Sequence, residues 1–195
     1  MKRLCGIMCL FFGLTLCLEF NVARGDLTID ILGTSGSSEL TISLNGTVDI
    51  SPTSGSAGGR GSWTFDVQGD FFNAFFSADQ TISNLVVTND TSGAASSFVG
   101  QVDFNGTTDQ LRLFGLSPGI SYQANDSITF SGTEIINLNS GTFDNFTIGS
   151  YSLTATDLTG NLQLNVSAVP EPSSFAMLAA GFLAVTHRRR RRFCR

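Results

Sequence analysis

Aliphatic and polar residues alternate where the central part of the chain begins, in Leu27-Thr28-Ile29-Asp30-Ile31. The same period of two recurs at residues 40–44, which read Leu-Thr-Ile-Ser-Leu, and at residues 63–67, which read Trp-Thr-Phe-Asp-Val. Successive side chains of a β-strand point to opposite faces, so this period is typical of a strand with one face on a core and the other in water. We therefore expect these segments to be half-buried strands.

The pattern continues to the end of this region. Further apolar positions that share a strand face are Phe98, Val102 and Phe104, Leu111 and Leu113, Ile128 and Phe130, and Leu162, Leu164 and Val166. Short strands separated by turn signals about every 8 to 12 residues are typical of a sandwich. We therefore predict one all-β domain over residues 26–168, with the architecture of a β-sandwich or jelly roll.

Two Asn-Gly pairs indicate hairpin turns, because both residues tolerate positive φ. They are Asn45-Gly46, between two alternating runs, and Asn105-Gly106. Residues 71–76 read Phe-Phe-Asn-Ala-Phe-Phe and are the one stretch whose i, i+4 spacing is compatible with a short helix.

Charge is distributed unevenly along the chain. Residues 26–168 contain fourteen acidic residues against only two basic ones, Arg60 and Arg112, which gives a net charge of −12. Such a surface repels phosphate backbones, which argues against nucleic-acid binding. The same region contains no His and no Cys, so thiol catalysis, Ser-His triads and zinc or haem ligation are excluded there. It contains no disulfide either, and its core alone must stabilise it.

The first 25 residues have the pattern of a secretory signal peptide. Lys2 and Arg3 precede an apolar run over residues 4–18, and small residues then flank a cleavage site. Ala23 and Gly25 occupy its −3 and −1 positions, so that Asp26 becomes the first residue of the mature chain. The apolar run is short for a permanent span of about 20 residues. We expect export machinery and signal peptidase as the first partners.

The C-terminal segment, residues 169–195, combines three features in a fixed order. Pro170, Glu171 and Pro172 come first, then an apolar stretch over residues 175–185, and then Arg188, Arg189, Arg190, Arg191 and Arg192. The prolines keep the backbone extended. The apolar stretch is expected to enter the inner membrane as a short transmembrane helix, and the arginines to remain on the cytoplasmic side.

This order resembles the PEP-CTERM sorting signal of bacterial proteins. In that family an integral-membrane protease, exosortase, recognises and processes the tail and so directs the protein to the cell surface or beyond. The resemblance implies that Pro170, Glu171 and Pro172 are the recognition triplet and that the five arginines act as a stop-transfer cluster. Bacteria with this signal are often producers of exopolysaccharide. The resemblance covers about the last 27 residues and implies nothing about the activity of the β domain.

Catalytic and metal sites are poorly supported by the domain's residues. Its only glutamates are Glu39 and Glu134, so a glycosidase pair would have to come from these or from aspartates. Residues 103–109 resemble a calcium loop in composition but place Gly at position 4 rather than 6. A hairpin explains them better. Calcium held between loops of a sandwich stays open as an alternative, and otherwise we expect no cofactor.

We therefore expect an exported, non-enzymatic protein of the cell envelope, surface or extracellular matrix, anchored through its C-terminus until the tail is processed. One alternative is a carbohydrate-binding module, with or without calcium, that acts on exopolysaccharide; its amphipathic aromatic candidates are Trp63, Tyr122 and Tyr151. The other is a secreted glycan hydrolase or lyase that uses carboxylates.

Overall fold

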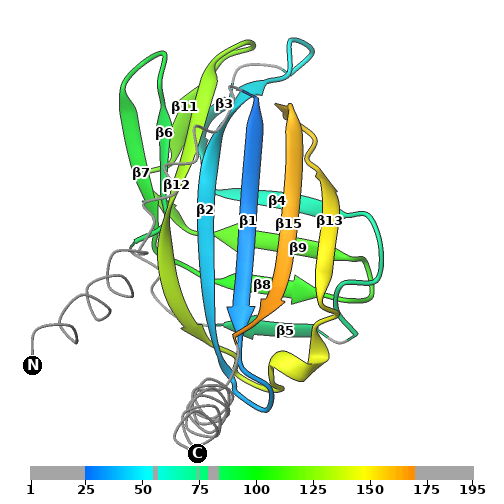
Figure 1. The fold of residues 1–195 in the computed structure, drawn as a ribbon. Coiled ribbons are helices and arrows are strands. Elements are labelled where there is room, and N and C mark those ends of the chain that lie inside the picture. Colours follow the sequence, from blue (N-terminus) through cyan, green and yellow to red (C-terminus); the bar gives the residue numbers. More distant parts are fainter. Residues whose placement is uncertain (1–24, 55–56, 74, 79–83, 170–195) are drawn as a thin grey trace, which may run out of the picture.

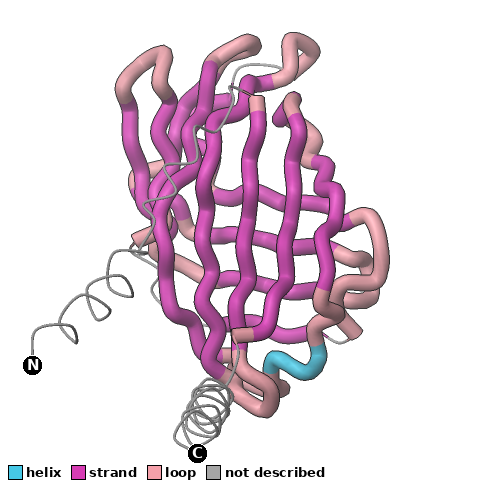
Figure 2. Tube along the Cα trace, in the orientation of Figure 1, coloured by secondary structure: helices cyan, strands magenta, loops and turns pink. Residues whose placement is uncertain are grey.

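A computed structural model of the chain describes residues 25–54, 57–73, 75–78 and 84–169. In these residues the secondary structure is β throughout, apart from the single 3₁₀ turn η1 (Phe143–Asn145). Figure 2 shows how strands dominate the fold. The prediction of an all-β domain is therefore confirmed.

Thirteen of the described strands form one continuous sheet. Its front part consists of long strands that stand side by side in the order β12 (Ser127–Asn137), β2 (Glu39–Ile50), β1 (Asp26–Gly33), β15 (Asn161–Ala168) and β13 (Gly149–Thr154). From β13 the sheet continues into shorter strands that cross behind the front part (Figure 1), namely β4 (Ser62–Val67), β9 (Gln110–Phe114), β8 (Val102–Asn105) and β5 (Phe75–Ala78).

The remaining strands lie beyond the other side of the front part. Next to β12 come β6 (Val86–Asn89), β7 (Ala94–Phe98) and β10 (Leu116–Ser117), while β14 (Leu158–Thr159) pairs with β2. A separate two-stranded sheet consists of β3 (Ala57–Arg60) and β11 (Ile120–Tyr122).

The sheet curls so that its front and crossing parts enclose one core. The turn between them is made by β13 and β4, where Leu153 pairs with Val67. Trp63 on β4 then meets Phe130 on β12 edge to face, with ring centroids 5.2 Å apart. Because both parts belong to one hydrogen-bonded sheet, the finer prediction of a sandwich or jelly roll stays a prediction.

An aromatic cluster fills the core at the end of the sheet where η1 lies. Phe146 packs against Phe72 and Phe104, with centroid separations of 4.4 and 5.0 Å. Phe72 also forms an isolated antiparallel bridge with Phe146, and β5 begins at Phe75. The short helix considered for residues 71–76 is therefore wrong, because buried aromatic packing and strand pairing determine the described part of this stretch.

The hairpin prediction is wrong at Asn45-Gly46 and confirmed at Asn105-Gly106. Gly46 lies inside the twelve-residue strand β2, opposite Leu27 of β1 and Phe130 of β12. Its φ is 150°, and a Cβ there would overlap the carbonyl oxygen of Asp26. Hydrogen bonds to two neighbouring strands outweigh the local turn preference of the pair. Asn105, by contrast, ends β8 and pairs with Gln110 at the start of β9.

The two ends of the domain lie at opposite ends of the sheet. The neighbours β1 and β15 run parallel, with Asp26 opposite Asn161 and Gly33 opposite Ala168. The chain therefore enters at the Asp26 end, and its described part leaves at the Gly33 end, seven residue steps or about 23 Å of strand away. Figure 1 shows β1 and β15 with their arrows in the same direction. We call the Gly33 end of the sheet the tail end and the Asp26 end the far end.

Candidate functional site

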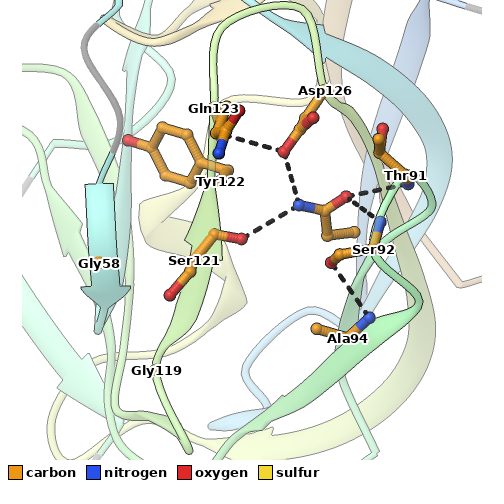
Figure 3. Close-up of a pocket in the computed structure, with 10 residues that line it drawn as sticks. Gly58, Thr91, Ser92, Ala94, Gly119, Ser121, Tyr122, Gln123 and Asp126 are labelled. Atoms are coloured by element: carbon orange, nitrogen blue, oxygen red, sulfur yellow. Dashed lines mark hydrogen bonds between the residues drawn. The ribbon is translucent and has the colours of Figure 1, made fainter.

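A pocket of about 660 Å³ opens at the far end of the sheet. It lies between the turn that joins β6 to β7 and the segment from β11 to the start of β12, with β3 at its side (Figure 3). The lining residues are Gly58, Asn89, Thr91, Ser92, Ala94, Gly119, Ser121, Tyr122, Gln123 and Asp126. The pairing of Asn89 with Ile128, two residues after Asp126, brings these two loops together.

Asn89 holds the walls of the pocket in place. It is only 1% exposed. Its amide nitrogen Nδ2 donates to the Ser121 carbonyl oxygen at 3.0 Å and to Asp126 Oδ2 at 2.8 Å. Its Oδ1 accepts hydrogen bonds from the backbone N–H groups of Thr91 and Ser92. All four hydrogen-bonding positions of this amide are therefore used inside the protein, which makes Asn89 a positioning residue.

Asp126 supplies the negative charge of the pocket. Its Oδ2 accepts the backbone N–H of Gln123 at 2.9 Å in addition to the Asn89 amide. The Gln123 hydrogen bond first, and the Asn89 one second, hold the pKa of the Asp126 carboxyl below its ordinary value of 3.8. Asp126 is therefore ionised at neutral pH and has no proton to give as a general acid. Asp126 thus accepts a hydrogen bond from its own turn.

The chemistry of the lining limits what the pocket can bind. Hydroxyl groups of Thr91, Ser92 and Ser121 and the amide of Gln123 stand beside one carboxylate, and no Lys or Arg is among the lining residues. A phosphate or carboxylate ligand would find no counter-charge there. Neutral hydroxylated ligands and cations fit this lining better.

Arg60 links several strands at the edge of the core, beside the pocket. Its Nη1 donates to the Tyr122 hydroxyl at 2.6 Å and forms an ion pair with Asp157, and its Nε donates to the carbonyl oxygen of Ser62. The guanidinium also lies 4.9 Å from the ring centroid of Trp63. Cation–π attraction and charged hydrogen bonds thus join β3, β4, β11 and the segment before β14.

The aromatic residues considered for sugar stacking are used inside the domain. Trp63 is fully buried and offers no ring face to a ligand, whereas Tyr122 is 4% exposed and is among the residues that line the pocket. Tyr151 is half-buried, and its hydroxyl donates to the Thr147 carbonyl oxygen at 2.8 Å. Trp63 is therefore no candidate for sugar stacking, because core packing and the contact with Arg60 cover its ring. For Tyr122 and Tyr151 the carbohydrate-binding alternative stays a prediction.

The glutamates of the domain do not form a catalytic pair. Glu39 pairs with Asn137 in the register of β2 and β12. Glu134 lies three positions before Asn137, so the alternation of the strand places the two glutamates on opposite faces of the sheet. Glu134 also accepts the backbone N–H of Asn84 at 3.0 Å. A two-carboxylate mechanism would need aspartates instead.

The stretch at residues 103–109 is a hairpin, as the sequence indicated. The Asn105 side chain accepts the backbone N–H groups of Thr107 and Thr108, at 3.0 and 3.3 Å. In the described residues, no group of three or more His, Cys, Asp and Glu side chains is placed to hold a metal ion. Calcium binding between loops stays a prediction.

The residues assigned to export and sorting fall mostly outside the described part of the chain. This is so for Ala23, for Pro170, Glu171 and Pro172, and for Arg188 to Arg192. Gly25 and Asp26 are described: Gly25 donates its N–H to the Thr47 carbonyl oxygen, and its own carbonyl oxygen accepts the N–H of Asn161. Cleavage after Gly25 stays a prediction. Within the described residues, no helix has the length and apolar character of a membrane span.

Sequence reasoning did not find the pocket. Its two loops carry Asn89-Asp90-Thr91 and Asn125-Asp126-Ser127, and each of these patterns indicates a turn but no partner. Only the register of β6 against β12 brings them together.

A β domain followed by Pro-Glu-Pro, an apolar stretch and an arginine cluster has the organisation of an exported protein with a C-terminal sorting segment. Comparison with protein families identifies that segment: the model of the PEP-CTERM protein-sorting motif matches residues 168–192. The recognition of this motif from the sequence is therefore confirmed. No curated protein and no solved structure matches the chain.

Proposed function

We propose that the chain is an exported bacterial protein that exosortase sorts to the cell surface or extracellular matrix, where residues 26–168 act without catalysis as a structural or interaction domain. The observation that carries the proposal is the match of the PEP-CTERM motif to residues 168–192. Export machinery and signal peptidase act first, the inner membrane holds the precursor through its tail, and exosortase then processes the tail.

The position of the motif in the fold supports removal of the tail without damage to the domain. The motif begins at residue 168, where β15 ends. Strand β15 is held on one side by eight pairs to β1 and on the other by β13. The hydrogen bond from the Val169 N–H to the Gly33 carbonyl oxygen is the last described contact of the backbone. A cut beyond Val169 would leave every described strand pair intact.

A binding role suits the pocket better than a catalytic one. Asp126 is held as an anion by hydrogen bonds within its own loops, and Asn89 has no hydrogen-bonding position to spare. Neither group can therefore donate a proton as a general acid. Glycan hydrolysis also needs a carboxyl group that stays protonated, and the environment of Asp126 favours the opposite state.

The second part of the proposal is that the pocket binds exopolysaccharide. The hydroxyl and amide groups that line it, without a cationic residue among them, favour a neutral hydroxylated chain. Glycan-array binding that disappears on Gln123→Ala and persists in Gln110→Ala, a substitution on β9, would support this. Release of shorter products from polysaccharide would instead identify a hydrolase or lyase, and a calcium-dependent rise in melting temperature would identify a metal-assisted module.

A triple substitution tests sorting. Pro170→Ala, Glu171→Ala and Pro172→Ala should leave a longer, membrane-bound precursor in a host that has exosortase, because the recognition triplet is lost while the apolar stretch remains. Deletion of residues 188–192 is the matched control: it weakens the stop-transfer signal and should release unprocessed protein from the membrane. Normal maturation of the triple variant would contradict the role of the triplet.

A further inference from the structure

Exposed aliphatic side chains gather at the tail end of the front sheet. Of the described residues, those that are large, apolar and exposed are Ile135, Ile148, Val169 and Val99, with 55, 61, 46 and 42% of their surface accessible. Three of the four lie at the tail end. Ile135 is near the end of β12, Ile148 directly precedes β13, and Val169 directly follows β15. The fourth, Val99, follows β7.

The strand register places these residues in one row across the outer face. Ile135 pairs with Thr41, Thr41 with Leu32, and Leu32 with Ser167. Gly149 pairs with Val166, so Ile148 continues the row opposite Ser167. We call Ile135, Leu32 and Ile148, together with the adjacent Val169, the aliphatic row. The row runs perpendicular to the strands and therefore across the direction in which the chain leaves the domain.

The rest of the outer face has a different character. The next two rows toward the far end consist of Thr133, Ser43, Asp30, Asn165 and Ser150, and of Ser131, Asn45, Thr28, Gln163 and Ser152. Several of these side chains form hydrogen bonds with one another. Ser43 bonds to Thr133, and Asn165 bonds to Ser150 and to Asp30. Aliphatic outward positions thus first appear at the level of the row, which also holds Thr41 and Ser167; the next outward pair toward the tail end, Asn137 and Glu39, is polar again.

The tail brings this end of the sheet close to the membrane. Six residue steps separate Val169 from Phe175, where the apolar stretch begins, and six extended steps reach about 20 Å. An anchored domain therefore cannot move its tail end farther than this from the bilayer. Because Ile135, Leu32 and Ile148 lie at one level along the strands, they can reach one depth when the strands stand upright on the membrane, with Val169 two residues nearer to the bilayer.

The size and composition of the row favour a lipid surface over a protein partner. Four partly exposed aliphatic side chains amount to far less than the roughly 1,000 Å² of a stable protein interface. They include none of the Trp, Tyr or Arg residues that dominate such interfaces. Next to a membrane a weak apolar contact is sufficient to orient the domain, because the anchored tail already keeps the domain at a high effective concentration near the lipid surface.

From this arrangement we propose that the aliphatic row rests in the headgroup region of the bilayer while the tail anchors the chain, so that the pocket at the far end faces away from the membrane. This inference rests on the anchoring step of the proposed function. It adds an orientation and a contact surface within the domain.

Fluorescent labels on the full-length chain test the orientation. Cys5, Cys9, Cys17 and Cys194 are replaced by serine, and an environment-sensitive label is attached at Ile135→Cys in protein reconstituted into phosphatidylcholine vesicles that carry a quencher on the lipid headgroup. Ser131→Cys is the matched control, since it lies on the same face of the same strand, four residues toward the far end. Zwitterionic lipid is used because the acidic domain would be repelled by an anionic surface.

We expect the label at 135 to be quenched several-fold more strongly than the label at 131. Ile148→Cys provides a second position, on a different segment, and should behave like 135. Equal quenching at 131 and at both row positions, or quenching at none of them, would overturn the inference. A change in the fluorescence of the labels at 135 and 148 that occurs only after exosortase is added would also overturn it, because the row would then contact the protease and not the lipid.

Flotation of the same vesicles separates this inference from the proposed function. Protein that floats with the vesicles but leaves both row labels unquenched refutes the contact surface alone. Protein that fails to float refutes the anchoring step, and the inference fails with it.

Discussion

Substitution of Asn89 tests whether one buried amide organises the pocket. Asn89→Ala removes four hydrogen bonds, one of them to the ionised Asp126. A hydrogen bond to a charged group contributes about 1.5–3 kcal/mol, and a neutral one about 0.5–1.5 kcal/mol. Water entering the space will satisfy some of the freed groups, so we expect a loss of about 3 kcal/mol in the free energy of unfolding. For a domain of this size that corresponds to a fall of about 10 °C in melting temperature.

The matched control is Asn105→Ala. Asn105 also accepts two backbone N–H groups in an Asx turn, but it is more exposed than Asn89 and occupies a simple hairpin. We expect this substitution to lower stability by about 1 kcal/mol. Urea unfolding followed by circular dichroism gives both values. An Asn89→Ala protein that loses no more stability than Asn105→Ala would refute the role assigned to the Asn89 amide.

The dependence of stability on pH gives a second readout of the same contact. The pKa of Asp126 is lowered in the folded protein, so the stability that this group contributes is complete above its ordinary value of 3.8 and is lost as the pH falls through the folded value. The difference in free energy of unfolding between the native protein and Asn89→Ala should therefore become smaller in acid. Asn89→Asp should be destabilising at pH 7, where two carboxylates face each other, and should recover part of the loss on acidification.

Three further outcomes are expected. Arg60→Met should lower the free energy of unfolding by about 2–3 kcal/mol, since it removes charged hydrogen bonds to Asp157 and Tyr122 and the contact with Trp63. In the described part of the structure the Arg112 side chain donates to Gln110, so the control Arg112→Met should lower it by less than about 1 kcal/mol. Equal losses would contradict the stabilising role of Arg60. Residues 26–168 expressed alone should give a far-UV spectrum of β structure in reducing buffer, because the segment contains no Cys; a spectrum dominated by helix or random coil would rule this out. N-terminal sequencing of the surface protein should begin at Asp26, and a retained segment 4–18 would count against signal cleavage.

The strands could be predicted where their pattern is local. Leu27, Ile29 and Ile31 are all fully buried on β1, as their alternation with polar residues indicated. The turn at Asn105-Gly106 was found for the same reason, since it joins strands that are neighbours in sequence. Side-chain alternation and tight turns depend on a few adjacent residues, and those are visible without the fold.

Features that depend on distant partners could not be predicted. Gly46 belongs to a central strand because β1 and β12 pair with it from both sides, and nothing near Asn45 shows this. The contact between Asn89 and Asp126 needs the register of β6 on β12. Ile135-Ile136 did carry a local signal, because two adjacent aliphatic residues break the alternation of β12. That break coincides with the outward-facing Ile135 of the aliphatic row.

Intact mass spectrometry of the mature protein, isolated from the surface or medium of a host with exosortase, tests the sorting account most directly. The account predicts a chain that begins at Asp26, contains all residues through Ala168 and lacks the arginine cluster at 188–192. In a matched strain without exosortase, the mass should include the complete tail. A surface protein that retains residues 188–192 in the presence of exosortase would contradict the account.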